Sequence, residues 1–420
     1  MSHDILTSLF TWATGIEDTF IPQARPGLRT LEEYELTQHY QLWKSDFDLV
    51  AETGMQAIRW GIPWYRVQPA PDRWDWEWTD QALDYLVNGK GLTPILDLMH
   101  YGTPLWLEDS FIDPAYPQYV AEYTHQVVAR YKSLVRYYTP LNEPMVNADM
   151  CGMKGEWPPY LSGDDGYVKM ILALAKGIIL TTQAIKVEQP DAITVQVEAL
   201  WYTFTHDESL KARVAHDNAR QYLCFDLTTG RVGEEYELIR YLQKHGITDE
   251  DLNWFNSHAM TFNIFGANFY PWSYGELKQH PDGSVEHITG ETSGDKIAIV
   301  LKEVYERYHM PVMVTETSAN ADVKGRAKWM YETLDAVRAL RATGIPVIGY
   351  TWFPLFTMVD WAYRTGSGPL EDYLIHLGLF DSEFDETGIL NRCRTPLVDN
   401  FRNQMRQPMP PITNDRSPNP

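Results

Sequence analysis

The sequence predicts an α/β protein that folds as a single (β/α)8 barrel with long loops after its strands. Short apolar runs alternate along the chain with segments of helical periodicity, which is the pattern of repeated βα units. Such units imply parallel strands with right-handed crossovers, and eight of them close a barrel. Eight apolar runs are present, and they begin near residues 9, 56, 93, 134, 193, 262, 311 and 346.

The local patterns agree with this assignment. Most of the apolar runs, such as LTPILDLMH and MPVMVTET, are continuous, as expected for strands buried on both faces. Helices are predicted between them, near 37–53, 79–90, 116–132, 166–187, 291–308 and 323–343. Glycines stand just past the ends of several of these helices, where C-caps belong: Gly54, Gly91 and Gly344.

The chain is longer than a minimal barrel requires, so we expect long loops at 144–165, 201–260 and 354–380. We assign residues 1–407 to one barrel domain and residues 408–420 to a Pro-rich tail, which we expect to run over the surface or to be disordered. The alternative is an open, doubly wound sheet. No GxGxxG or GxxxxGK loop follows any predicted strand, and this favours the closed barrel.

Composition excludes several classes of function. The formal charge of 35 − 57 = −22 opposes binding to nucleic acid and to anionic membranes. The sequence shows no signal-peptide pattern and no apolar stretch of 18 residues, and three cysteines, Cys151, Cys224 and Cys393, are too few for a disulfide framework. We therefore expect a cytoplasmic protein, whose oligomeric state the sequence does not define.

Two predicted strands end in a glutamate. The fourth ends in TPLNEP, which contains Glu143, and the seventh ends in VTET, which contains Glu316. The carboxyl ends of barrel strands carry the chemistry in such folds, and these two strands lie on opposite sides of the barrel. Two facing carboxyls about 5–5.5 Å apart are the machinery of retaining glycoside hydrolysis. Either glutamate alone could equally be a surface loop carboxylate.

Motifs along the chain resemble those of glycoside hydrolase family 1, the β-glucosidase-like family of clan A, over about residues 8–405. TPLNEP resembles the acid/base motif of this family and VTETS its nucleophile motif. Other segments resemble the family's strand motifs in the same order: FTWATG, AIRWGIPWYRVQP, LDLMHYGTPLWL, FGANFYPW and GYTWFPLFTMVDW. The resemblance implies a TIM barrel in which Glu316 is the nucleophile and Glu143 the general acid/base.

The resemblance also implies roles for residues around this pair. Arg59 is the expected counter-charge of Glu316, although it could form a salt bridge elsewhere. Tyr270 could donate a hydrogen bond to the same carboxylate or could be a packed aromatic. The remaining residues expected to bind the sugar are Glu17, His100, Asn142, Asn268, Trp352, Asp360 and Trp361.

The chain departs from the family around the first sugar. The family has Gln where this chain has Glu17, Trp where it has Tyr101, and Asn where it has Thr317. Asp360 replaces a Glu and lies one residue farther from Trp352. The resemblance is therefore to a divergent member with an altered first-sugar subsite.

We accordingly expect a retaining, exo-acting β-glycosidase that acts on a small glycoside or oligosaccharide. Two alternatives keep the same residues: a transglycosidase with the same glutamate pair, and a catalytically silent barrel that binds saccharides. No histidine pair at ligand spacing accompanies a carboxylate, so we expect neither a metal nor another cofactor.

Overall fold

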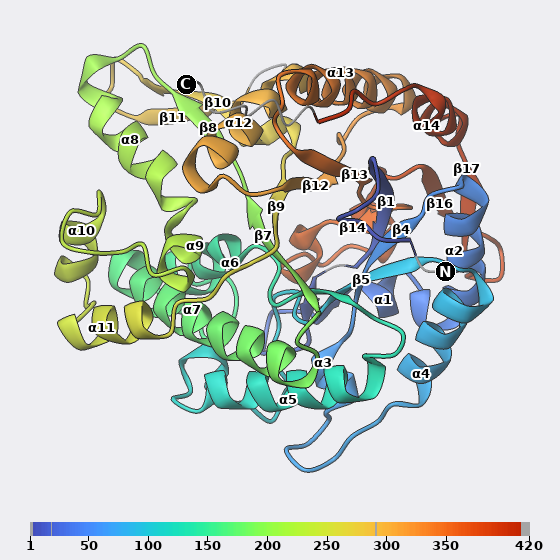
Figure 1. The fold of residues 1–420 in the computed structure, drawn as a ribbon, viewed down its shortest axis with the longest axis horizontal. Coiled ribbons are helices and arrows are strands. Elements are labelled where there is room, and N and C mark those ends of the chain that lie inside the picture. The colour runs from blue at the N-terminus through green and yellow to red at the C-terminus, as the bar shows by residue number, and fades with distance from the viewer. Residues whose placement is uncertain (1–2, 18, 290–291, 413–420) are drawn as a thin grey trace, which may run out of the picture.

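The computed structural model describes residues 3–17, 19–289 and 292–412. Eight parallel strands close into a barrel in the order β1-β13-β12-β9-β7-β6-β5-β4, which confirms the predicted fold class (Figure 1). The barrel strands are β1 (Thr11–Ile16), β4 (Ala57–Gly61), β5 (Thr93–Asp97), β6 (Tyr137–Thr139), β7 (Ile193–Ala199), β9 (Ile264–Asn268), β12 (Val312–Thr317) and β13 (Val347–Trp352).

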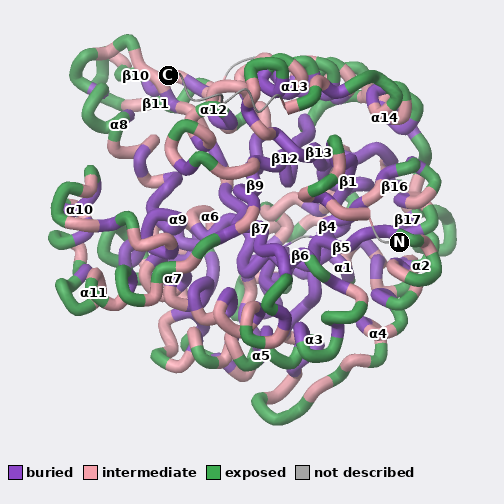
Figure 2. The backbone as a smooth tube through the Cα atoms, in the orientation of Figure 1, coloured by how far each residue is buried: buried purple, intermediate pink, exposed green. Residues whose placement is uncertain are grey.

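The barrel strands are buried over nearly their whole length, which explains their continuous apolar runs (Figure 2). Small and branched side chains from successive strands, such as Ala13, Ala57 and Ile95, pack together in a cluster of their own, and these sizes suit the narrow interior of a barrel. Strand register then sets the level of the polar residues. Arg59 lies opposite Gly15 of β1, and Glu316 lies opposite Asn268 of β9.

Long helices surround the barrel (Figure 1). They are α2 (His39–Thr53), α4 (Glu77–Asp84), α5 (Tyr116–Tyr131), α7 (Gly163–Glu188), α12 (Ile297–Tyr308), α13 (Val323–Ala342) and α14 (Leu397–Arg406). Gly54 ends α2 in the left-handed region with φ 84°, as predicted for a C-cap. Shorter elements complete this part of the fold: β2 (Phe20–Ile21), β3 (Leu31–Glu32), α1 (Glu33–Leu36), α3 (Trp64–Val67), β16 (Phe380–Phe384) and β17 (Leu390–Arg394).

Helix α7 is long and apolar enough to cross a membrane by length and composition, with a mean hydropathy of 1.5 over its most apolar window. In the structure, 67% of that window is buried inside the protein. The helix packs along α5 and against α9 (Leu223–Thr228). Its apolar composition therefore matches that of a core helix, packed between the barrel and other helices.

All three predicted loops contain regular structure. The connection 201–260 folds into β8 (Tyr202–Phe204), α8 (Lys211–Arg220), α9, α10 (Ile239–Lys244) and α11 (Asp249–Ser257). β8 joins β10 (Tyr274–Gln279) and β11 (Val285–Ile288) in a small sheet beside the barrel. The segment after β6 forms α6 (Pro144–Ala148) and one π-helical turn, while the segment after β13 holds β14 (Met358–Val359), β15 (Leu374–Ile375) and 3₁₀ turns.

Part of the predicted tail packs on the barrel domain. The Met409 side chain is buried, and the Pro410 carbonyl accepts a hydrogen bond from Arg341 Nε at 2.9 Å. Residues 413–420 lie outside the described part of the chain. Among the cysteines, Cys151 and Cys224 are buried free thiols and Cys393 is exposed.

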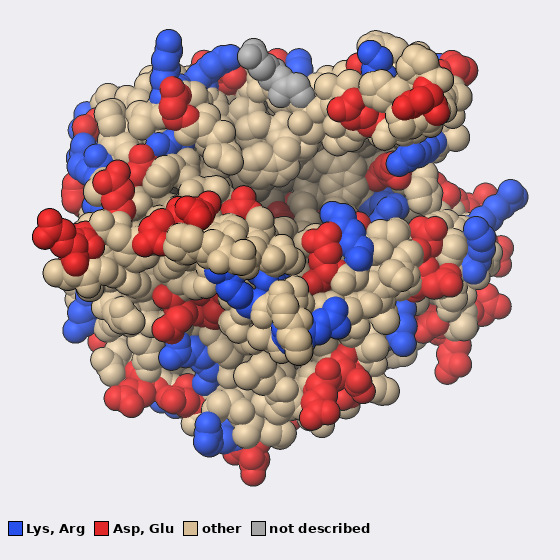
Figure 3. Space-filling view, turned by 180° about the vertical axis from the view of Figure 1, so that it is seen from behind, with Lys and Arg blue, Asp and Glu red and all other residues tan. Residues whose placement is uncertain are grey.

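Figure 3 shows the face that is turned away from the viewer in Figure 1. Acidic and basic side chains are interspersed over it, and a hollow near its centre is walled mostly by uncharged atoms. This face presents no continuous basic surface, in agreement with a net charge of −22.

The helical insertion is joined to the outer helices through one buried carboxylate. Asp226 of α9 is fully buried and accepts hydrogen bonds from Tyr236 Oη at 2.9 Å and Tyr308 Oη at 3.0 Å. Arg307 Nη2 lies 2.5 Å from the same carboxylate. Since every partner is a donor, removal of Asp226 would leave the hydroxyls of Tyr236 and Tyr308 without this acceptor, and would leave Arg307 with only its contact to Glu237 Oε1 at 3.2 Å.

We predict that Asp226→Ala lowers the free energy of unfolding by about 3 kcal/mol, because it leaves two hydroxyls without their acceptor and removes the buried partner of Arg307, which keeps only Glu237. Urea unfolding followed by circular dichroism measures this loss. The control is Glu208→Ala, which removes an exposed ion pair to Lys211 and should cost less than about 1 kcal/mol. Equal losses in the two variants would contradict the assigned role of Asp226.

Candidate active site

A cavity of about 500 Å³ opens at the carboxyl ends of the barrel strands, a size typical of small-molecule sites. Both predicted catalytic glutamates, Glu143 and Glu316, line it. The other predicted site residues that line it are His100, Asn268, Tyr270, Asp360 and Trp361. The structure therefore brings together side chains that are far apart in the sequence. Glu17, which lies beneath the cavity, and Trp361, which lines it, are 344 positions apart.

Arg59 of β4 is fully buried beside the cavity. Its Nη1 lies 2.8 Å from Glu17 Oε1 and 2.6 Å from Glu316 Oε1, and its Nη2 lies 2.9 Å from Asp97 Oδ2. Nη2 also donates to Asn142 Oδ1 at 3.1 Å. One guanidinium thus connects carboxylates from β12, β5 and the end of β1.

The charged groups in this cluster shift one another's pKa values. Burial lowers the pKa of Arg59, but the negative charges of Glu17, Asp97 and Glu316 outweigh burial and raise it. Burial raises the pKa of Glu17 well above 4.5, opposed by Arg59 and reinforced by Asp97. Burial also acts to raise the pKa of Asp97, yet hydrogen bonds from Glu17 and His100 bring it below 3.8. Of these two carboxyls, Glu17 is therefore the more readily protonated and Asp97 the more readily ionised.

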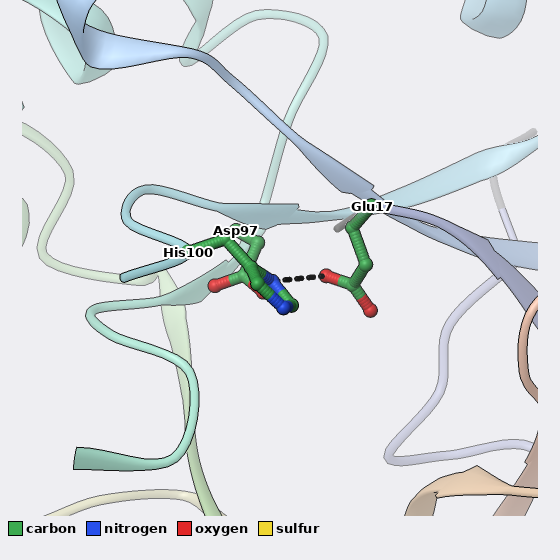
Figure 4. Close-up of side chains that lie close together, drawn as sticks. All are labelled: Glu17, Asp97 and His100. Carbon is green, nitrogen blue, oxygen red and sulfur yellow. Dashed lines mark hydrogen bonds and ion pairs between the residues drawn. The ribbon is translucent and has the colours of Figure 1, made fainter. Parts of the chain in front are cut away.

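Glu17, Asp97 and His100 are also the candidate metal ligands, since a ligand atom of each lies within 4.8 Å of the others (Figure 4). Figure 4 shows Glu17 approaching from the end of β1 and the other two side chains from the end of β5. The Arg59 guanidinium already contacts Glu17 and Asp97. A cation held by the same oxygens would lie against another cation, so this cluster fits an ion-pair network better than a metal site.

Glu316 accepts from two donors. Arg59 Nη1 contacts its Oε1, and Tyr270 Oη donates to its Oε2 at 2.7 Å. These are the two partners that the sequence predicted for this carboxylate. A cation and a hydroxyl donor on its two oxygens stabilise the ionised form.

Glu143 has different surroundings. Tyr101 Oη donates to its Oε2, and Asn268 Nδ2 donates to its Oε1 at 2.8 Å. Burial raises the pKa of Glu143 to about 7, and the negative charge of Glu316 adds to this shift, while the hydrogen bonds from Tyr101 and Asn268 oppose it. Glu143 thus titrates near neutral pH, as a group that must both give and take a proton requires.

The backbone at Glu143 is tightly constrained. The residue has φ 44° and precedes Pro144, which begins α6, so strand β6 turns into a helix within a few residues. The Glu143 N–H donates to the Val197 carbonyl of β7 at 3.2 Å. Left-handed backbone is uncommon for a residue with a side chain and gathers at functional sites.

Asn142 lies behind the catalytic pair and is fully buried. Its Nδ2 contacts His100 Nε2 at 3.1 Å and donates to Tyr101 Oη at 3.0 Å. Its Oδ1 also accepts from Asn268 Nδ2 at 3.3 Å. Asn142 therefore links the groups around Glu143 to Arg59.

The two predicted tryptophans differ in position. Trp352 is fully buried, and its indole N–H donates to the Leu377 carbonyl at 3.2 Å, so its edge faces the protein. Trp361 lines the cavity. Asp360 also lines it, and its Oδ1 accepts from the Ala362 N–H at 2.8 Å, so this carboxylate caps a 3₁₀ turn.

Glu17 does not line the cavity. Its side chain is fully buried and turned toward Arg59. Phe353 lines the cavity above it and packs so closely on Gly15 that a Cβ there would lie 2.4 Å from the Phe353 ring. Glu17 therefore contacts Arg59 and not the cavity, so any influence of Glu17 on a ligand in the cavity is indirect, through Arg59.

The order of the strands divides the cavity wall into two sides. Val146 and Met150 follow β6, Ala199 ends β7, and Trp272 follows β9, so these residues form one continuous side. Polar and aromatic groups from β5 and from the segment after β13, including His100, form the other. Trp272 is 48% exposed and stacks on Tyr270 with ring centroids 4.6 Å apart.

Several residues of the site were absent from the predicted set, among them Tyr101, Trp272 and Phe353 of the cavity wall and Asp97 of the Arg59 cluster. Asp97 ends a predicted strand, so the rule that located Glu143 and Glu316 could have found it. Tyr101 was noted as a departure from the family, but its contact with Glu143 depends on a backbone φ of 79°. No sequence pattern indicates that conformation.

The chain matches the model of glycosyl hydrolase family 1 over residues 14–366. It is 24% identical to Beta-glucosidase 47 of Arabidopsis thaliana, over 88% of this chain and 76% of that protein. It is 23% identical to Beta-glucosidase A of Thermotoga maritima, over 77% of this chain and 79% of that protein. The structure of the Thermotoga maritima β-glucosidase in complex with glucoimidazole superposes with a TM-score of 0.81 at 18% identity, covering 94% of this chain and 98% of that one.

The protonation of Glu17 leads to a prediction about stability. Its pKa is raised well above 4.5 in the folded protein, so its contribution to stability is complete below 4.5 and is lost as the pH rises through the folded value. The Glu17→Gln amide has no such proton to lose and can still donate to Asp97. We expect the variant to gain stability relative to wild type as the pH rises from about 4.5 to about 8.

Urea unfolding of both proteins at several pH values measures this difference. The control is Glu208→Gln, which changes an exposed carboxylate and should differ from wild type by a nearly constant amount. A constant difference for Glu17→Gln as well would show that Glu17 is ionised in the folded protein.

Proposed function

Because the chain belongs to glycosyl hydrolase family 1, we propose that it is a retaining, exo-acting β-glycosidase in which Glu316 is the nucleophile and Glu143 the acid/base. The observation that most supports this proposal is that the two buried glutamates of the cavity have contrasting electrostatic environments. Glu316 is paired with the cation Arg59, whereas the pKa of Glu143 is raised to about 7. Two carboxyls whose environments separate their protonation states are suited to opposite roles.

In the first step, an oxygen of Glu316 attacks the anomeric carbon as the bond from that carbon to the leaving-group oxygen breaks. Glu143 gives its proton to the leaving oxygen, and the products are a glycosyl ester of Glu316 and the free aglycone alcohol. Tyr270 and Arg59 hold the carboxylate of Glu316 for attack. The Glu143 proton is available because burial and the charge of Glu316 favour the neutral acid.

In the second step, Glu143 is ionised and removes a proton from water as the water oxygen attacks the anomeric carbon. The ester bond to Glu316 breaks, Glu316 returns as a carboxylate, and Glu143 ends protonated for the next cycle. Two inversions at one carbon leave the β configuration unchanged.

The aglycone belongs on the side of the cavity formed after β6, β7 and β9. Val146 and Met150 lie on the helical segment that begins beside Glu143, so a leaving group protonated by Glu143 lies near them. The opposite side carries His100, Asp360 and Trp361, which suit the hydroxyls and the apolar face of a terminal sugar. This arrangement supports exo action on a terminal glycone.

The protein is a glycoside hydrolase, and its relatives are β-glucosidases. We propose β-glycosides as the substrate class. The proposal does not name the glycone, because the residues expected to bind the first sugar differ from those of the family. Transfer of the glycosyl unit to an alcohol in place of water would use the same pair of glutamates. Cytoplasmic location remains a prediction from the sequence.

We predict that Glu316→Gln lowers kcat/KM for 4-nitrophenyl β-D-glycosides by at least about a thousandfold, because an amide is not a nucleophile. A panel that varies only the glycone identifies the best substrate for this assay. The control is Glu198→Gln, which changes a fully buried glutamate of β7 that does not line the cavity and should retain activity.

A proton NMR time course with the best substrate should show the β anomer of the sugar first. An α anomer as first product would exclude double displacement, and release of alkyl glycoside in added methanol would measure transfer. A wild-type protein that is inactive on the whole panel would favour the saccharide-binding alternative.

A second prediction concerns pH. The first step requires protonated Glu143, whose pKa is raised to about 7, so kcat/KM should fall about tenfold per pH unit above pH 7. In Glu143→Gln this alkaline limb should disappear when the leaving group is 2,4-dinitrophenolate, which needs no proton. An unchanged alkaline limb in the variant would assign the titration to another group.

A further inference from the structure

Tyr101 contacts the proposed acid/base, and its position is closely defined. It follows His100 after β5, is 1% exposed, and has φ 79°. Its ring packs against Trp157 and Trp361, with centroids 5.2 Å and 5.8 Å away. Gly102 follows it, and a Cβ at Gly102 would lie 1.6 Å from a backbone oxygen, so the turn requires glycine at that position.

The direction of the hydrogen bond from Tyr101 to Glu143 follows from a chain that begins at Arg59. Arginine has donors only, so the Asn142 atom that faces Arg59 Nη2 at 3.1 Å must be its carbonyl oxygen. The amide nitrogen of Asn142 then faces Tyr101 Oη at 3.0 Å and donates to it. The Tyr101 hydroxyl accepts this bond, and its single proton is directed to Glu143 Oε2.

Asn268 contacts the other oxygen of Glu143 as part of a second series of hydrogen bonds. Its Nδ2 lies 3.3 Å from Asn142 Oδ1, which Arg59 fixes as an acceptor, so this Asn268 atom is the amide nitrogen. The same nitrogen donates to Glu143 Oε1 at 2.8 Å, while Asn268 Oδ1 accepts from Thr315 Oγ1 at 2.7 Å. Both oxygens of Glu143 therefore face donors whose direction is set elsewhere. An acceptor pair of this kind matches a carboxylate better than a carboxylic acid.

We propose that Tyr101 is a positioning residue for Glu143: its hydroxyl, oriented by Arg59 through Asn142, holds the Glu143 carboxylate in place for the second, base-catalysed step. This inference rests on the proposed function of Glu143. The inference extends that function because the family has Trp at the position of Tyr101, and the indole N–H of Trp is a donor of different reach and direction. Burial and Glu316 favour the acid form, and Tyr101 opposes them, so that Glu143 is able to change state twice in each turnover.

The test is Tyr101→Phe, which removes the hydroxyl and keeps the ring between Trp157 and Trp361. Loss of one donor to an ionised carboxylate should raise the pH of the alkaline limb of kcat/KM by about one unit. The second step should slow by about tenfold, so kcat for activated aryl glycosides falls while kcat/KM below the limb changes little. A purely structural role for Tyr101 would lower both constants and leave the limb in place.

The matched control is Tyr116→Phe. Tyr116 is equally buried, lies outside the cavity, and has a hydroxyl whose recorded contact is Met99 Sδ at 3.7 Å. Its pH profile should match that of wild type. An equal shift of the limb in both tyrosine variants would overturn the proposal.

A readout independent of turnover separates this inference from the proposed function. Infrared difference spectra between proteins with Glu143 and with Glu143→Gln follow the carboxyl stretch of Glu143 through a pH titration. The midpoint should rise by about one unit when Tyr101→Phe is introduced into both. An unchanged midpoint overturns the proposal even in an active enzyme, whereas a shifted midpoint with no turnover on the glycoside panel overturns the proposed function alone.

Discussion

The site is organised around one buried cation. Arg59 is fully buried and pairs with Glu17, Asp97 and Glu316, which come from three other barrel strands or their ends. An isolated charge at such a position would be strongly destabilising, so the arginine and its carboxylates depend on one another. Because these partners come from β1, β4, β5 and β12 or their ends, closure of the barrel is what brings the Arg59 cluster together.

The same cation explains why the two catalytic glutamates differ. Glu316 contacts Arg59 directly, whereas Glu143 reaches it only through Asn142 and receives neutral donors. Burial and the charge of Glu316 then raise the pKa of Glu143 to about 7, although the hydrogen bonds from Tyr101 and Asn268 oppose this shift. A single arginine placed nearer to one carboxylate than to the other thus gives the two glutamates the different environments that the proposed roles of nucleophile and acid require.

The sequence predicted the barrel, the strand positions and the two glutamates, because these depend on local apolar periodicity and on residues at strand ends. It did not predict which side chains face the cavity beyond the strands. Trp352 turns its indole N–H to the Leu377 carbonyl, and Tyr101 reaches Glu143 through a left-handed backbone. Both outcomes depend on loops whose conformation is set by tertiary packing. The connection 201–260 is mostly helical for the same reason: its helices are stabilised by contacts such as that of Asp226 with α12.

The altered first-sugar subsite is compatible with an unchanged catalytic pair for an electrostatic reason. Where the family has a neutral Gln, this chain has Glu17, yet burial raises the pKa of Glu17 well above its usual value and so favours its neutral form. In the Arg59 cluster the pKa of Glu17 is raised and that of Asp97 is lowered, while Glu316 keeps its contact with the guanidinium. A carboxyl that remains protonated replaces an amide with almost no change in charge. The residues around the cavity can vary in this way while the pairing of Arg59 with Glu316, the proposed nucleophile, persists.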